Sequence, residues 1–328
     1  MKNYKSLKVS YVNNIHNISL VSNDFKEIKQ DEVLVKIKYS TLNYKDALSV
    51  TGTTKIIKGD SLIPGLDFSG IVVESNTKKF SKGDRVLATG SGLGETIDGG
   101  FSEYAYVPYN ILVKIPNKLS LLSAMQIGTA GFTAAIAIDK MLLNKQKINS
   151  GPILISGATG GVGSISINIL SNLGFEIIAA TRKKNSANYL KKIGSHKIMF
   201  LDNNFNKKFL DHRMFAGSID NIGGDLLDWI IKSTHDNGNI VSVGIASSYS
   251  LNTTVFPLIM RGVNILGISS TNYPNSKRKF VWRKLSDIYK PKKLNIINKK
   301  SIELADVKRY SKILLLGGNM GKVIIKNF

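Results

Sequence analysis

The feature that most constrains the fold of this chain is a glycine-rich segment at residues 152–163, which reads PILISGATGGVG. An apolar run with the composition of a strand leads into it, and an apolar-periodic run typical of a helix follows from Val162. A glycine turn between a strand and a helix is typical of a dinucleotide-binding βαβ unit. In such a unit Gly160 lets the backbone approach a pyrophosphate, and Gly163 lets the helix pack against the strand. Ala158 holds the usual first glycine position, which leaves less room, and a turn that binds no ligand is the alternative.

The end of the next predicted strand bears on which dinucleotide binds. An NAD site has Asp or Glu about 20 residues past the turn, whereas this chain has Ala180-Thr-Arg-Lys-Lys without a carboxylate. Arg182 is suited to a forked contact with a 2′-phosphate, and Thr181 to a further hydrogen bond. The segment therefore favours NADPH over NADH. The alternative is that residues 182–184 are only solvated charge in a lysine-rich chain.

The pattern along the chain predicts two domains. Short β-segments at residues 33–39, 70–74, 85–88 and 104–107 predict an all-β, barrel-like lobe. From residue 152 strands and helices alternate, which predicts an α/β fold with a parallel sheet. We expect strands at 153–156, 176–181, 197–201, 218–221, 239–243 and 263–267, helices at 162–173, 186–193 and 225–233, then a basic helix at 277–289 and a strand at 322–326. The boundaries near Ser123 and Gly267 divide the chain into residues 1–123 with 268–328, and residues 124–267.

Composition narrows the chemistry. The chain has no cysteine, and its four histidines show no paired ligand spacing, so we expect no metal site. We see no signal peptide, and the apolar run at residues 130–143 is shorter than the ~20 residues of a membrane span. These observations predict a cytoplasmic protein without a membrane partner. The net charge of +22 favours a general lysine bias, with phosphate-bearing ligands as the alternative. Nucleic-acid binding is a remote alternative, because only residues 277–284 combine basic and aromatic side chains.

Several blocks resemble one known family. They include the dinucleotide turn at residues 157–163 and five further segments: LNYKDAL at 42–48, IPGLDFSG at 63–70, IGTAGFT at 127–133, AGSIDNIG at 216–223 and TTVFPLIMRG at 253–262. Together they span nearly the whole chain, which resembles the acrylyl-CoA reductase group of the zinc-free, quinone-oxidoreductase-like medium-chain dehydrogenases/reductases. Zinc-dependent relatives carry His at the place of Leu66 and Cys at the place of Asn43, so both ligands are missing here.

The resemblance implies a GroES-like β-barrel domain, a doubly wound Rossmann domain and a homodimer. It implies NADPH-dependent reduction of the C=C bond of acrylyl-CoA, or of a similar short enoyl-CoA, without metal. A quinone or a free enone is the alternative substrate class. The cofactor contacts that it implies are Tyr44, Thr159, Gly160, Gly161, Val162, Thr181, Arg182, Asn221, Ile245, Ile268 and Lys322.

The candidate catalytic residues lie in one short segment, Asn43-Tyr-Lys-Asp46. Without a metal, hydrogen-bond donors must stabilise the enolate that hydride addition creates. We therefore consider Tyr44 a nicotinamide or substrate contact, Asn43 a neutral donor, Lys45 a nearby charge and Asp46 a residue that orients the loop. The alternative is an ordinary strand-to-helix turn in which Asn and Asp cap backbone groups. Residues 277–284 either meet coenzyme A phosphates or, as we favour, form the solvated face of a helix with Phe280 and Trp282 partly in the core.

Overall fold

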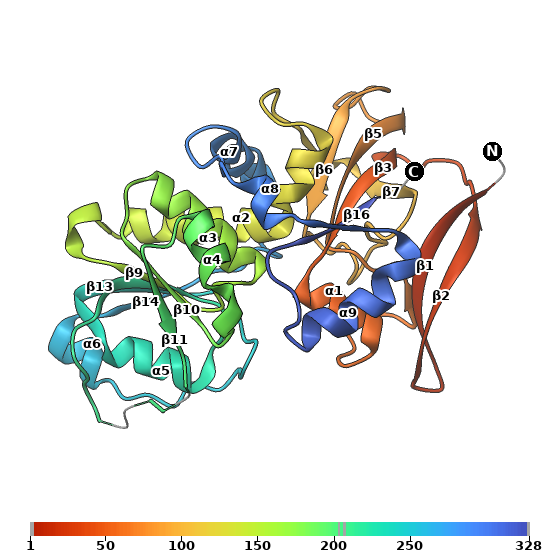
Figure 1. The fold of residues 1–328 in the computed structure, drawn as a ribbon. Helices are drawn as coiled ribbons and strands as arrows, with labels where there is room; N and C mark the ends of the chain where they lie inside the picture. Colours follow the sequence, from red (N-terminus) through yellow and green to blue (C-terminus); the bar gives the residue numbers. More distant parts are fainter. Residues whose placement is uncertain (1–2, 203, 206–207, 327–328) are drawn as a thin grey trace. The chain divides into compact units, whose positions relative to one another are not determined.

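The computed structural model describes residues 3–202, 204–205 and 208–326, and its chain divides into two compact units (Figure 1). Unit 1 comprises Met1–Phe132, Ser270–Ile288 and Asn298–Phe328. Unit 2 comprises Thr133–Ser269 and Tyr289–Ile297. Each unit has its own sheets and its own core, so each is described by itself.

Unit 2 is built around a parallel sheet. Among the described residues its strands are β9 (Ile153–Ile155), β10 (Ile177–Thr181), β11 (Lys197–Phe200), β12 (Phe215–Asp220), β13 (Thr234–Ser242) and β14 (Asn264–Gly267). They lie in the order β11-β10-β9-β12-β13-β14, and every neighbouring pair is parallel. Counted within the unit this is the order 3-2-1-4-5-6 of dinucleotide-binding folds. The predicted doubly wound sheet is confirmed.

Three helices of unit 2 follow the strands as the sequence pattern predicts: α3 (Gly161–Asn172), α4 (Ala187–Ile193) and α5 (Gly224–Lys232). The unit also contains α6 (Phe256–Arg261) and α8 (Leu294–Ile297), which were not predicted, and the end of the long helix α2 (Leu121–Leu143). Strands β9, β10 and β12 are buried along their whole length, because helices cover both faces of such a sheet. Most predicted bounds agree within one or two residues. Strands β12 and β13 are the exceptions, since β12 begins at Phe215 rather than 218 and β13 begins at Thr234 rather than 239.

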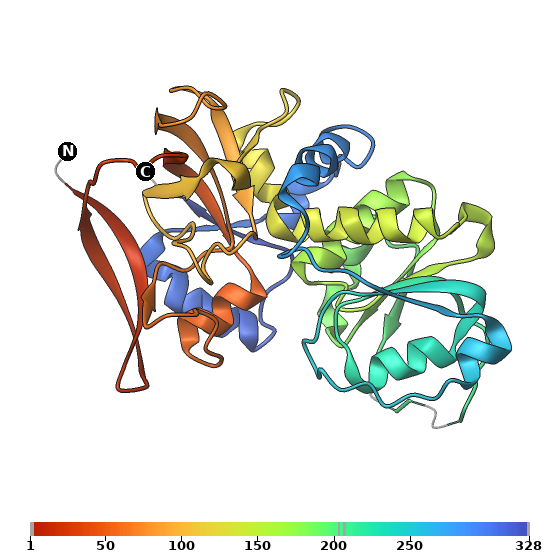
Figure 2. The ribbon, with the colours of Figure 1, turned by 180° about the vertical axis from the view of Figure 1, so that it is seen from behind.

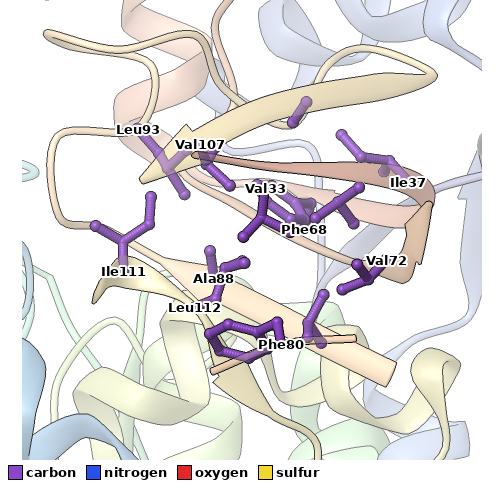
Figure 3. Close-up of a cluster of buried hydrophobic side chains, with 13 residues drawn as sticks. Val33, Ile37, Phe68, Val72, Phe80, Ala88, Leu93, Val107, Ile111 and Leu112 are labelled. Atoms are coloured by element: carbon purple, nitrogen blue, oxygen red, sulfur yellow. The ribbon is translucent and has the colours of Figure 1, made fainter. Parts of the chain in front are cut away.

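Unit 1 contains a mixed sheet and a smaller one. The larger sheet runs β15-β16-β3-β5-β6-β8 and has β7 paired to β3 as well. Its strands are β3 (Glu32–Leu42), β5 (Asp67–Ser75), β6 (Arg85–Thr89), β7 (Tyr104–Pro108), β8 (Val113–Lys114), β15 (Lys300–Ile302) and β16 (Val323–Lys326). Phe68, Val72 and Val107 belong to the apolar core that these strands enclose (Figure 3). The predicted β-barrel domain is confirmed in this sheet.

The prediction of an all-β first lobe was wrong in one respect, because unit 1 also has helices. Helices α1 (Tyr44–Thr51) and α9 (Val307–Leu315) were not predicted. Helix α7 (Asn275–Ser286) is the predicted basic helix, and the part of α2 (Leu121–Leu143) up to Phe132 also belongs to this unit. Helices α1 and α9 lie side by side (Figure 1). Asn43 is the N-cap residue of α1. The helix has only eight residues and directly follows a strand, so it is too short to give a clear helical period of apolar residues.

A long N-terminal hairpin was also missing from the prediction. Its strands are β1 (Asn3–Val12) and β2 (Ile15–Asp24), which pair along their full length and are drawn in red in Figure 2. Strand β4 (Ser61–Leu62) pairs with the other edge of β1. Ser, Asn and Lys are frequent in this hairpin, and no side chain of β2 is fully buried. Its apolar alternation is therefore weak, although the main-chain pairing is complete.

Helix α2 is the one described helix long and apolar enough, by length and composition, to cross a membrane. Most of its side chains are buried, and its backbone is not helical at Gly128. A long, mostly buried apolar helix is also what the core of a folded domain contains. The prediction of a buried helix at residues 130–143 agrees with this burial.

Candidate active site

The predicted cofactor residues of unit 2 follow the carboxyl ends of its strands. Thr159–Val162 come after β9, Thr181 and Arg182 end and follow β10, and Asn221 follows β12 directly. Ile245 comes three residues after β13, and Ile268 comes directly after β14. In a parallel sheet all these ends lie at one edge, where ligands of open α/β folds bind. Local patterns scattered over 110 residues of sequence thus meet at one edge of the sheet.

The glycine turn has the geometry that a pyrophosphate requires. Gly160 is the N-cap residue of α3, is exposed and has an ordinary extended backbone, with φ −77°. A Cβ atom at Gly160 would meet only the Gly157 carbonyl oxygen, at 3.2 Å, so the space in front of the helix is open. A Cβ at Gly163 would instead lie 2.5 Å from that oxygen. The turn therefore fits a dinucleotide, with Gly160 facing the ligand space and Gly163 packed inside the fold.

Hydrogen bonds join the turn to the neighbouring strand β12. The side-chain amide of Asn221 donates to the Ser156 carbonyl at 2.8 Å, and the Asn221 main-chain N–H donates to the Ser156 hydroxyl at 2.8 Å. That hydroxyl donates to the buried Asp220 carboxylate at 2.6 Å. Burial raises the pKa of Asp220, against the lowering effect of its hydrogen bonds. The network lies between strands β9 and β12, where the strand order reverses and where open α/β sheets bind their ligands.

The end of strand β10 carries the residues that favour NADPH. Thr181 is buried, and its hydroxyl accepts a hydrogen bond from the Lys183 main-chain N–H at 3.1 Å. Arg182 is exposed at the edge of the sheet. Ile245 is exposed and Ile268 is half-buried. The hydrogen bond between Lys183 and Thr181 fixes the backbone on both sides of Arg182. A fixed backbone suits an Arg182 guanidinium that makes a forked contact with a phosphate or stacks on a planar ring.

In unit 1 the segment from Asn43 to Asp46 starts helix α1. Asp46 accepts hydrogen bonds from the Asn43 main-chain N–H at 2.9 Å and from its side-chain amide at 3.0 Å. Its other oxygen accepts from the Leu66 N–H at 2.9 Å. Tyr44 is 42% exposed, and Lys45 forms an ion pair with Glu95 at 2.6 Å. The segment is therefore a capped helix start that leaves Tyr44 at the surface of the unit.

Behind this helix start lies a buried carboxylate, Asp67. It accepts from the Thr41 hydroxyl at 2.7 Å and from the Asn43 amide at 3.3 Å. Asp46 is also buried, and its burial, together with the Asp67 charge, raises the pKa of Asp46 to about 7. The Asn43 amide nitrogen therefore donates to two carboxylates inside the unit. Asp46 also accepts from main-chain N–H groups, which is what the capping alternative expects of it.

Lys322 is a buried cation of unit 1. Its Nζ donates to the Met125 carbonyl at 3.0 Å and to the Ile127 carbonyl at 2.8 Å. Burial lowers the pKa of Lys322 to about 8, while the Asp67 charge acts in the opposite direction. Tyr44 and Lys322 thus belong to unit 1, whereas the other predicted cofactor residues belong to unit 2.

The basic helix α7 divides into a buried and an exposed face. Trp282 lies in the core, as predicted, and is fully rather than partly buried. The buried Arg278 donates to the Thr89 and Thr271 carbonyls. The placement of Phe280 partly in the core was wrong, since it is 49% exposed and lies beside Lys279 and Arg283. The helical period puts residue 280 on the face opposite the core, which the buried residues 278, 281, 282 and 285 define.

Sequence reasoning missed several residues that shape these sites: Asp67, Glu95, Gly128, Ser156 and Asp220. Two of them had a sequence signal. Asp67 begins strand β5 and Asp220 ends strand β12, so each places a carboxylate next to buried strand residues, where a charge is costly unless it is hydrogen-bonded. Glu95 and Gly128 have no such signal, because their partners are distant in sequence. Among residues 3–202, 204–205 and 208–326, no group of three or more His, Cys, Asp or Glu side chains has a metal-binding arrangement.

Comparison with known proteins matches both parts of the chain. Residues 29–117 match the alcohol dehydrogenase GroES-like domain, and residues 161–287 match the zinc-binding dehydrogenase family. The putative quinone oxidoreductase YhfP of Bacillus subtilis is 36% identical, covering 92% of each chain. The probable acrylyl-CoA reductase AcuI of Escherichia coli is 33% identical, covering 92% of this chain and 93% of its own.

A solved structure has the same fold. Escherichia coli YhdH with bound NADPH superposes with a TM-score of 0.94 at 31% identity, covering 98% of this chain and all of its own. Although one matching family is named for zinc, this chain has no cysteine and carries Leu66 and Asn43 at the expected ligand positions.

Proposed function

Since this chain belongs to the acrylyl-CoA reductase group of the quinone-oxidoreductase-like medium-chain dehydrogenases/reductases, we propose that it reduces the C=C bond of acrylyl-CoA or a similar short enoyl-CoA with NADPH. The observation that carries this proposal is the glycine turn at the strand-order reversal of unit 2, with Arg182 at the next strand end. The similarity to a reductase named for acrylyl-CoA supports the substrate class.

NADPH is held at the carboxyl edge of the unit 2 sheet. The N–H groups that start α3 at Gly161 and Val162 meet the pyrophosphate, together with Thr159 and the open backbone of Gly160. Arg182 binds the 2′-phosphate and Thr181 supports it. Asn221, Ile245 and Ile268 line the remainder of the edge. The resemblance also assigns Tyr44 and Lys322, both of unit 1, to the cofactor, although the Lys322 ammonium already donates to two main-chain carbonyls.

When bound, the reduced nicotinamide supplies a hydride to the β-carbon of the enoyl thioester. The chain's own task is to orient the substrate and to stabilise the enolate oxygen. Tyr44 is the exposed donor of the catalytic segment, and Lys45 is a nearby cation whose charge Glu95 balances. Asn43 and Asp46 hold the segment through their mutual hydrogen bonds. The enolate then takes a proton at its α-carbon, for which water is the proposed source.

The substrate class is tested by a panel of acrylyl-CoA, longer enoyl-CoAs, a free enone and a quinone, each with NADPH and with NADH. We expect the largest kcat/KM for acrylyl-CoA with NADPH. The reaction rate is measured as the loss of the absorbance of the reduced nicotinamide. A larger kcat/KM for the quinone or the enone would establish the alternative, an NADPH quinone/enone oxidoreductase, which the similarity to YhfP supports. Failure of every acceptor would overturn both.

We also propose that the protein is a homodimer, and the outermost strand of the unit 2 sheet, β14, supports this. Strand β14 pairs with β13 on one side only among the described residues. Apolar side chains exposed on and before this strand include Val255 (64%), Ile259 (74%), Met260 (59%) and Ile265 (37%). An exposed apolar surface beside an open sheet edge is typical of subunit contacts. Light scattering should give twice the chain mass, and Ile259→Lys should halve it. Leu316→Lys, at an exposed apolar residue of unit 1, is the control.

A cytoplasmic location without a membrane partner is likewise proposed, as is the absence of a nucleic-acid partner. The net charge of +22 motivates the remote alternative of nucleic-acid binding. The affinity for single-stranded RNA, measured across a salt series, distinguishes a protein without a nucleic-acid partner from a nucleic-acid-binding protein. Tight binding that weakens steeply with salt would support the alternative.

A further inference from the structure

The break in helix α2 at Gly128 leaves two helix ends inside unit 1. Gly128 has φ 52° and ψ −158°, a conformation that is essentially restricted to glycine. The carbonyls before the break lose their helical partners, and so do the N–H groups after it. Buried groups of this kind require partners, because an unpaired one is costly.

Each of the two ends is satisfied by a buried charge of the sign that the helix dipole favours. Lys322, 3% exposed, donates to the carbonyls of Met125 and Ile127 at the carboxyl end of the first part. Asp67, fully buried, accepts from the Thr129 N–H at 2.7 Å at the amino end of the second part. A cation at a helix carboxyl end and an anion at an amino end are both stabilising.

Both charges face the break itself. A Cβ atom at Gly128 would lie 2.5 Å from the Lys322 Nζ and 2.9 Å from an Asp67 carboxylate oxygen. The Asp67 charge also acts on the Lys322 ammonium, since it raises the Lys322 pKa against burial. No larger residue fits at position 128 without displacing one of the two charges.

The same Asp67 carboxylate holds the catalytic segment. It accepts from the Thr41 main-chain N–H at 3.0 Å, from the Thr41 hydroxyl at 2.7 Å and from the Asn43 side-chain amide at 3.3 Å. Asn43 is the residue before Tyr44 and caps helix α1. One carboxylate therefore binds both the start of the second part of α2 and the start of the helix that carries Tyr44.

We propose that Asp67 and Lys322 are positioning residues, which cap the two helix ends at Gly128 and, through Asn43, fix the segment that carries Tyr44 to the same point. The catalytic part of this inference rests on the proposed reductase function. It gives Lys322 a role in holding the fold of unit 1, in place of the direct cofactor contact that the resemblance implied. Displacement of a reacting group by about 1 Å is enough to lower a rate about 100-fold.

Amide hydrogen exchange of the protein alone tests the structural part, without any substrate. In Asp67→Asn, peptides covering residues 41–48 and 125–132 should both exchange about tenfold faster or more than in the wild type. In Lys322→Met and in Gly128→Ala, peptides covering 125–132 should change most. Asp84→Asn is the matched control and should leave both segments unchanged, because the partly exposed Asp84 carboxylate pairs with Lys114 and accepts from the Ser81 N–H elsewhere in unit 1.

A rise confined to residues 41–48 in Asp67→Asn would overturn the proposal, because Asp67 would then hold the catalytic segment alone. An equal rise across all of unit 1 would also overturn it, since the residues would then only stabilise the fold. If Asp67→Asn does not fold, hydrogen exchange of the Lys322→Met and Gly128→Ala variants still shows whether residues 125–132 exchange faster than the rest of unit 1.

Kinetics with the acceptor that the wild type reduces best tests the catalytic part. For Lys322→Met we expect kcat to fall about 10- to 100-fold while the Kd for NADPH, measured by binding alone, changes less than about threefold. A Kd that rises as much as kcat falls would instead make Lys322 a cofactor contact. If the wild type reduces no acceptor, the proposed function fails, while the exchange result still decides whether the two residues hold the break.

Discussion

The side-chain amide of Asn221 donates to the main-chain carbonyl of Ser156 across 2.8 Å, which joins the ends of strands β12 and β9. These two strands flank the point where the strand order of unit 2 reverses. A Cβ atom at Gly157 would lie 3.2 Å from the Asn221 Cβ, so the Asn221 side chain packs directly on the glycine turn. The shape of the turn therefore depends on a residue more than 60 positions later in the sequence.

Asn221→Ala should weaken NADPH binding about fivefold, because one hydrogen bond that holds the turn, worth about 1 kcal/mol, is lost. Isothermal titration of the purified variant with NADPH measures the Kd. Asn188→Ala, at an exposed Asn of α4 in the same unit, should bind as the wild type does. An unchanged Kd in Asn221→Ala would show that Ser156 and the glycines hold the turn without the amide.

Arg182→Ala should reduce the preference for NADPH over NADH. Loss of a charge-assisted contact to the 2′-phosphate costs about 1.5–3 kcal/mol, so the ratio of kcat/KM for the two cofactors should fall about 10- to 100-fold. The rate with NADH should change little. Lys184→Ala removes an exposed charge from the same loop and serves as the control. If both variants lose the preference for NADPH equally, Arg182 contributes only its positive charge and makes no specific contact with the 2′-phosphate.

The two glycines of the turn should separate binding from stability. Gly160→Ala places a methyl group in the open space before α3, so the Kd for NADPH should rise while Tm stays within a degree or two of the wild type. Gly163→Ala places its methyl group 2.5 Å from the Gly157 carbonyl oxygen, and should cost about 1–3 kcal/mol of stability. Thermal unfolding and titration of both variants test the pair. The reverse pattern would mean that Gly160 is packed inside the fold.

Asp46 should make the stability of the protein depend on pH in a particular direction. Its pKa in the folded chain is raised from 3.8 to about 7 by burial and by the Asp67 charge. The folded state therefore binds more protons than the unfolded state between pH 4 and 7, and this contribution to the unfolding free energy falls as pH rises through that window. The Tm advantage of the wild type over Asp46→Asn should be largest near pH 4, shrink up to pH 7 and then stay constant. An advantage that grows with pH would contradict the raised pKa.

The parts of the fold that could be predicted from the sequence are those encoded by neighbouring residues. The glycine turn, the alternating strands and helices of unit 2 and the residues at the strand ends are all local patterns of glycine position and apolar period. Because parallel strands share one carboxyl edge, correct local assignments were enough to gather Thr181, Arg182 and Asn221 at one edge. The polar β1–β2 hairpin was not predicted, because its alternation of apolar and polar residues is weak.

The sequence by itself determined the nucleotide fold, the lack of a cysteine metal site and the lack of a carboxylate after strand β10. Only the tertiary structure decided the partners of the buried charges. Asp67 meets Thr129 across 62 residues, Lys322 meets Met125 across 197, and Lys45 meets Glu95 in another loop. No local period encodes such pairs, because burial makes them necessary only after the strands and helices have packed. The helix break at Gly128 is decided in the same way, by two charges that come from distant parts of the sequence.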